Sequence, residues 1–139
     1  VYPGTHDNNT TLGWWKELGK GSQEYCIEYG AWESDDDICD KIITMAFASR
    51  AKLAMVAMQD WLDLGADARM NTPSTVNANW AWRLKKGEPD ERISERILRK
   101  TKVYDRYTKT IVDEIVEVDN PDDIENDIVI QIVDAETEM

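Results

Sequence analysis

The residues best suited to chemistry form one polar run near the start of the chain, Gly4-Thr5-His6-Asp7-Asn8-Asn9-Thr10. His6 is the only histidine, and it stands next to Asp7. A histidine can donate a hydrogen bond to a ligand hydroxyl group, and a carboxylate can accept one or stabilise developing positive charge. The structural alternative is an Asx-type turn that caps the next helix and leaves His6 merely exposed.

A second polar stretch lies further along the chain. It begins at Gln59-Asp60, continues from Arg69 to Thr75, and ends at Asn79-Trp80-Ala81-Trp82-Arg83. Its amide, hydroxyl and guanidinium groups are of the kinds that bind sugar hydroxyls. Aromatic faces also stack on sugar rings, and the chain has six Trp residues. We nevertheless expect most of these Trp side chains to belong to the core.

Strands and helices that alternate along the chain are expected to position these residues. Strands are expected at 1–2 and 53–58, each ending just before a polar run. The apolar run 53–58 fits a strand buried on both faces of a parallel sheet, although its pattern also allows a helix. Residues 19–22 are expected to form a turn and 69–79 a loop. Helices are expected at 9–18, 23–29, 38–49 and 89–107, with one helical turn at 61–64.

This alternation predicts an α/β fold. In an α/β barrel the active site is built from polar residues just after the C-terminal ends of the strands, so both polar stretches would face the same rim. Two strands alone would leave sheet edges unpaired. The chain has 139 residues, whereas a complete eightfold barrel typically has about 250. The body therefore resembles a slice of a larger barrel or doubly wound sheet.

The negative charge gathers at the C-terminal end. Of the 28 acidic and 16 basic residues, eleven acids and no base fall within 110–139. We therefore expect two domains, a body at 1–109 and an acidic tail at 110–139. The tail alternates Ile and Val with acids around the turn signal Asn120-Pro121-Asp122-Asp123. It is compatible with a β-hairpin or docking strand, with a helical extension, and with a solvated, partly ordered arm.

Composition argues against several classes of partner. A net charge of -12 disfavours nucleic acid and anionic membrane surfaces. No run of about 18 apolar residues is present, and the chain does not open with a signal-peptide pattern, so we expect a cytoplasmic protein. Cys26 and Cys39 have neither zinc-pair nor redox-motif spacing. A disulfide is possible, but two free thiols are favoured in the cytoplasm.

Both polar stretches resemble the signature of the 4-α-glucanotransferases, the amylomaltases or disproportionating enzymes of maltodextrin and starch metabolism. The resemblance covers roughly residues 1–107, with its motifs in the same order as in the family. Four segments carry it: Gly4 to Thr10 with Gly13-Trp14-Trp15, Gln59 to Gly65, Arg69 to Pro73, and Asn79 to Leu84.

The resemblance implies a (β/α)8 barrel, of which 1–109 would supply about the last two β/α units. It also implies retaining transfer of 1,4-α-glucan segments between maltodextrins. Asp7 matches the carboxylate that supports the oxocarbenium-like transition state, and His6 matches a neighbour that binds the same sugar. Asn71, Thr72 and Pro73 match a loop near the donor sugar. The implied ligand is a maltodextrin or starch-type glucan, and no metal or organic cofactor is implied.

The departures from the family pattern are also informative. The family's nucleophilic Asp and its acid/base Glu lie on earlier strands and are absent from this chain, so we expect the isolated chain to be inactive. Its expected protein partner is the missing N-terminal part of the barrel. Ser74 stands where the family has Gly, and Ala57-Met58 replaces an expected Pro before Gln59. The alternatives are a non-catalytic glucan-binding fragment and a truncated gene product.

Overall fold

The computed structural model describes residues 1–76 and 79–107. The chain divides into two units, Val1–Tyr107 and Thr108–Met139. The hairpin and helix alternatives for the acidic tail lie outside the described residues. Within the described part, no helix is long and apolar enough to cross a membrane.

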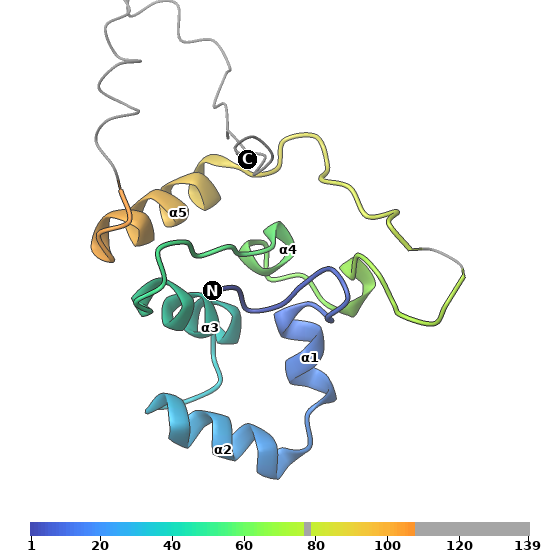
Figure 1. Cartoon of the computed structure of the whole chain (residues 1–139), viewed down its shortest axis with the longest axis horizontal. Coiled ribbons are helices and arrows are strands. Elements are labelled where there is room, and N and C mark those ends of the chain that lie inside the picture. The colour runs from blue at the N-terminus through green and yellow to red at the C-terminus, as the bar shows by residue number, and fades with distance from the viewer. Residues whose placement is uncertain (77–78, 108–139) are drawn as a thin grey trace, which may run out of the picture. The chain divides into compact units, whose positions relative to one another are not determined.

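The first unit is built from helices (Figure 1). α1 packs against α3, and α3 packs against α4 and α5. The helices are α1 (Thr11–Glu17), α2 (Lys20–Gly30), α3 (Ile38–Ala48), α4 (Met58–Trp61) and α5 (Glu91–Val103), with a 3-10 helix η1 (Ala66–Ala68) between α4 and α5. The helix α3 therefore lies at the centre of this unit.

The two predicted strands are not formed as strands, and residues 1–76 and 79–107 contain no strand at all. Their backbones nevertheless pair. Val1 N donates to Leu53 O at 2.8 Å, and Met55 N donates to Val1 O at 2.9 Å. This is the slanted pattern of a parallel ladder, with Val1 opposite Ala54. A parallel pair is stable inside a larger sheet covered on both faces, and these residues supply only the pair.

Several helix boundaries differ from the expected ones. α1 begins at Thr11, two residues after the expected start, because Thr10 is its cap and Thr10 Oγ1 accepts a hydrogen bond from Gly13 N at 3.1 Å. α2 begins at Lys20, within the expected turn. Its Gly21 falls in the first turn, where backbone N–H groups have no partner within the helix and a break signal therefore weighs less. α4 begins at Met58, the last residue of the predicted strand.

α5 is shorter than the predicted helix at 89–107. Asp90 caps it, because its side chain accepts a hydrogen bond from Ile93 N at 2.9 Å. Pro89 therefore precedes the helix and is not part of its first turn. The helix ends at Val103, and Tyr104 is its C-cap.

The core consists of two clusters of buried side chains. One contains Ile43, Phe47, Trp61 and Ile93, and the other contains Trp15, Ile38 and Cys39. The expectation that most Trp side chains are core is wrong, because of the six only Trp15 and Trp61 are buried, and Trp80 is 53% exposed. Met45 of α3 is 41% exposed and does not belong to the buried face of this helix. Cys26 and Cys39 are free thiols, as expected.

Charged side chains fasten α5 to α3. Lys100 Nζ lies 2.8 Å from Asp40 Oδ2, and Arg96 Nε lies 3.1 Å from Asp40 Oδ1. Arg106 donates to the backbone oxygens of Phe47 and Ser49 at 2.7 and 2.8 Å. These bonds satisfy carbonyl groups at the C-terminal end of α3. The bonds of Arg106 also fix the segment that follows α3 and leads to residues 53–57.

Candidate active site

The loop 4–10 is folded by its own polar side chains. Asn8 Oδ1 accepts hydrogen bonds from Thr5 N at 2.7 Å and from Thr5 Oγ1 at 3.0 Å. Asn9 Oδ1 accepts one from Thr10 N at 2.8 Å. The helix cap of the structural alternative is present at Thr10, but its Asx-type turn is not, because Asn8 and Asn9 accept from residues three before and one after them and not from the backbone two residues further on. These bonds still fold the loop. They leave the intervening His6 and Asp7 exposed, so the capping function and a ligand-binding function are compatible.

Asp60 anchors α1 behind this loop. Its Oδ1 accepts a hydrogen bond from Thr11 N at 2.7 Å, and the residue is 5% exposed. Burial raises the pKa of Asp60 above its ordinary value, and the bonds from Thr11 offset this only in part. The neighbouring Gln59 Nε2 donates to Ala68 O at 3.3 Å. Gln59 and Asp60, at the start of the second polar stretch, are thus buried, and Asp60 fixes the end of the loop through Thr11.

Asp7 and Asn71 meet, although they are 64 positions apart. Asn71 Nδ2 donates a hydrogen bond to Asp7 Oδ1 at 2.6 Å. His6 Nε2 lies 3.4 Å from the same carboxylate oxygen. Three of the five predicted site residues are therefore in one cluster. An exposed carboxylate oriented by an amide donor can accept hydrogen bonds from a polyhydroxylated ligand.

Thr72 and Pro73 are placed differently. Within the described part of the chain, no hydrogen bond joins either residue to His6 or Asp7. Thr72 N donates to Asn79 Oδ1 at 2.9 Å, and Thr72 O accepts from Thr75 Oγ1 at 2.7 Å. Ser74 has a φ of 65°, in the left-handed region that glycine favours. The serine therefore adopts the kind of conformation for which glycine is the usual residue.

Trp80 is a site residue to which sequence analysis assigned no individual function. Its ring centroid lies 4.9 Å from that of His6, with an angle of 42° between the planes. Trp80 N donates to Met70 O at 2.7 Å, which brings the segment after the loop back to the segment before it. The sequence indicated an aromatic residue within the second polar stretch, but it did not indicate that the ring of this residue lies against His6.

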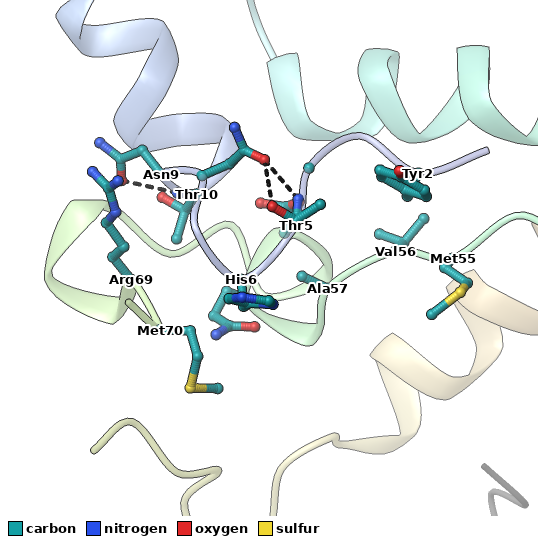
Figure 2. Close-up of a pocket in the computed structure, with 14 residues that line it drawn as sticks. Tyr2, Thr5, His6, Asn9, Thr10, Met55, Val56, Ala57, Arg69 and Met70 are labelled. Atoms are coloured by element: carbon teal, nitrogen blue, oxygen red, sulfur yellow. Dashed lines mark hydrogen bonds between the residues drawn. The ribbon is translucent and has the colours of Figure 1, made fainter. Parts of the chain in front are cut away.

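A cavity of about 520 Å³ opens beside His6 (Figure 2). Loop 4–10 supplies a polar wall, and Met55, Val56 and Ala57 supply apolar side chains. Arg69 and Met70 close a further side. Asp7, Asn71, Thr72 and Pro73 are not among its lining residues. The arrangement thus offers an open, largely apolar hollow next to a cluster of hydroxyl-binding groups, which suits a ligand with both polar edges and apolar faces.

Comparison with known proteins identifies the family. A family model described as 4-alpha-glucanotransferase matches residues 1–89. A 4-α-glucanotransferase of Streptococcus pneumoniae is 36% identical over 114 residues, which cover 81% of this chain and 23% of that protein. A chloroplastic/amyloplastic 4-α-glucanotransferase of Arabidopsis thaliana is 46% identical over 84 residues, which cover 60% of this chain and 15% of that protein.

A solved structure agrees with these sequence matches. The structure of an amylomaltase from Streptococcus agalactiae in complex with acarbose has a TM-score of 0.72 and 33% sequence identity. The match covers 77% of this chain and 22% of the other. The chain thus spans less than a quarter of the length of these relatives. The resemblance of its motifs is confirmed, and the chain belongs to the 4-α-glucanotransferase family.

Proposed function

We propose that this chain forms part of the active site of a retaining 4-α-glucanotransferase, with Asp7 as the carboxylate that stabilises the transition state. Residues 1–109 would belong to a (β/α)8 barrel completed by the rest of the protein. The hydrogen bond from Asn71 Nδ2 to Asp7 Oδ1 supports this proposal most directly, because it joins two of the four segments on which the family resemblance rests.

In the proposed reaction, a carboxylate from the rest of the barrel attacks the anomeric carbon of a 1,4-α-glucan. A carboxylic acid on the other side protonates the leaving glycosidic oxygen. A sugar 4-hydroxyl then attacks the glycosyl-enzyme and gives its proton back to that acid/base group, which restores both carboxyl groups. Asp7 accepts hydroxyl hydrogen bonds from the distorted ring and stabilises its developing positive charge. His6 donates to the same sugar, and the loop of Asn71, Thr72 and Pro73 lies beside the donor sugar.

The proposed ligand is a maltodextrin or a starch-type glucan, and the proposed compartment is the cytoplasm. The body suits a neutral ligand, because residues 1–109 carry 17 acids against 16 bases. The Streptococcus agalactiae relative was solved in complex with acarbose. The corresponding site of this chain would bind an oligosaccharide at the cluster of His6, Asp7 and Asn71, next to the cavity.

A hybrid enzyme tests this proposal. The matching stretch of the Streptococcus pneumoniae relative is replaced by this chain, and release of glucose and longer dextrins from maltotriose is measured. We expect activity in the hybrid, and a loss on the order of 100- to 1,000-fold in kcat on Asp7→Asn, because one electrostatic stabiliser of the transition state is neutralised. Asp67→Asn, at an exposed position of η1, is the matched control and should leave kcat unchanged.

Two results would contradict the proposal. One is an Asp7→Asn hybrid as active as its parent. The other is disproportionation of maltotriose by the isolated 139-residue chain, which is expected to be inactive without the two reacting carboxyl groups.

A second candidate function is glucan binding without catalysis. The exposed indole of Trp80, packed against His6, favours it, because aromatic faces stack on sugar rings. Titration of the isolated chain with maltodextrin, followed by tryptophan fluorescence, separates the two candidates. Saturable binding that Trp80→Leu abolishes, combined with an inactive hybrid enzyme, would favour the binding function.

A further inference from the structure

The side chain of Arg69 connects the two segments that carry the site. Its Nη2 donates to Asp7 O at 2.6 Å, and its Nε donates to Asn71 O at 2.8 Å. In Figure 2 this side chain extends from its own segment toward the loop that precedes α1. One guanidinium group therefore bonds to the backbones of both residues whose side chains meet in the hydrogen bond between Asn71 and Asp7.

The base of this arginine is held firmly. Arg69 N donates to Ala66 O at 3.1 Å and so closes η1. The preceding Ala68 is 4% exposed, and its backbone oxygen accepts the bond from Gln59. The guanidinium group therefore projects from a fixed point, and its two bonds fix the carbonyl groups relative to the protein body.

Only an arginine matches this geometry among the basic side chains. The guanidinium group is planar, permanently charged and presents several N–H donors in a rigid fork. Two acceptors in different directions can then be bound at once, and each bond is strengthened by the charge. A lysine carries its charge at a single nitrogen on a flexible stem, so it does not reproduce the two directions together.

We propose that Arg69 is a positioning residue that clamps the backbones of Asp7 and Asn71, so that the Asn71 amide holds the Asp7 carboxylate in its reactive orientation. This inference rests on the proposed function of Asp7, but the clamp itself is a separate structural claim. A displacement of about 1 Å at such a group can lower the rate by about 100-fold.

The clamp is tested first on the 139-residue chain alone, without any substrate. The side-chain amide protons of Asn71 are observed by NMR in nitrogen-15-labelled protein and assigned with Asn71→Ser. We expect the shifted signal of a bonded amide, and its move to the free-amide position in Arg69→Lys and in Arg69→Gln. Arg99→Lys, at an exposed position of α5, should leave the signal in place. An unchanged Asn71 signal in both Arg69 variants would overturn the clamp.

The catalytic consequence is tested in the hybrid enzyme. Arg69→Lys should lower kcat on the order of 100-fold with little change in KM, because the effect falls on the transition state. Arg69→Ala should recover part of its lost kcat when guanidinium ion is added at millimolar concentration, and ammonium ion should not restore it. A general loss of structure would not be repaired by guanidinium, which destabilises folded proteins. Absence of any rescue, together with unchanged kcat in Arg69→Lys, would overturn the positioning function.

The two tests separate the two proposals. An inactive hybrid that carries Arg69 and Asp7 would count against the proposed function of the chain. The NMR result would still decide whether Arg69 holds Asn71 against Asp7.

Discussion

At the scale of single residues, the site depends on the absence of a side chain at Gly13. A Cβ atom at this position would lie 2.4 Å from Asn9 Oδ1. That oxygen accepts the hydrogen bond from Thr10 N, and Asn9 Nδ2 donates to Glu17 Oε1 at 2.8 Å. The first turn of α1 can therefore pack against the Asn9 side chain only because residue 13 is glycine.

Gly13→Ala is expected to destabilise the chain, although alanine is the better helix former. The forced movement of Asn9 costs about 1–3 kcal/mol in strain and lost hydrogen bonds, which exceeds the gain of at most about 1 kcal/mol from helix propensity. Gly21→Ala in α2 is the matched control, because a Cβ there has no atom within 4 Å. It should stabilise the chain by less than the roughly 0.5–1 kcal/mol expected in a helix interior, because Gly21 lies in the first turn. Urea unfolding followed by circular dichroism measures both, and equal signs would contradict the packing argument.

At the scale of elements, the chain's own local signals explain its helices but not its strands. A cap at Asn9 or Thr10, an apolar face that includes Ile43, and an apolar face after Pro89 predicted α1, α3 and α5, because capping and periodicity act within a few residues. The strand at 53–58 depends on neighbours from the rest of a sheet, which local sequence cannot supply. The start of α2 was also missed, because Gly21 was interpreted as part of a turn although it lies in the first turn of the helix.

The residues of the candidate site were likewise only partly predictable from the sequence. The resemblance of motifs singled out Asp7, His6 and Asn71, and the structure brings them together. The contacts of Arg69 and Trp80 were not predictable, because backbone acceptors and ring neighbours depend on how two distant loops are folded together. The placement of Thr72 and Pro73 beside a donor sugar remains a prediction.

The contact between α3 and α5 should make stability depend on pH in acid. Burial disfavours the charged form of Asp40, but hydrogen bonds and charges of Lys100 and Arg96 outweigh it and lower its pKa. A lowered pKa in the folded state contributes stability above the unfolded value of about 3.9, and this contribution is lost as the pH falls through the folded value. Asp40→Asn should therefore lower the free energy of unfolding by about 1 kcal/mol at pH 7, a small value because the pair is partly exposed.

The measurement is urea unfolding of both proteins between pH 7 and pH 2. The difference between the Asp40→Asn variant and its parent should shrink below about pH 4. Glu95→Gln on the exposed side of α5 is the control, for which no such convergence is expected. A constant difference at all pH values would show that the carboxylate charge of Asp40 is not the cause.

At the scale of the whole molecule, the chain consists of two units with different compositions. Val1–Tyr107 contains the core and the candidate site, whereas eleven acids and no base fall in 110–139. The proposed partner of the first unit is the rest of a barrel, which agrees with the fact that the chain spans 23% of its Streptococcus pneumoniae relative. No partner is assigned to the acidic tail.

A chain that ends at residue 109 should therefore keep the stability of the first unit. We expect its free energy of unfolding to differ from that of the full chain by no more than about 0.5 kcal/mol, because both buried clusters lie before residue 94. Circular dichroism and urea unfolding of the two chains check this. A loss of several kcal/mol would show that the first unit depends on the tail.

The strand-like segment around Leu53 and Met55 has a consequence for the behaviour of the chain at high concentration. These two side chains are 63% and 59% exposed, on a segment that already pairs with the backbone of Val1. Such a segment can recruit a strand from a neighbouring molecule. Mutual repulsion from a net charge of -12 opposes that encounter, and its range shrinks to about 3 Å in 1 M salt. Added salt is therefore expected to promote self-association of the isolated chain, so its colloidal stability depends on its excess of acidic residues.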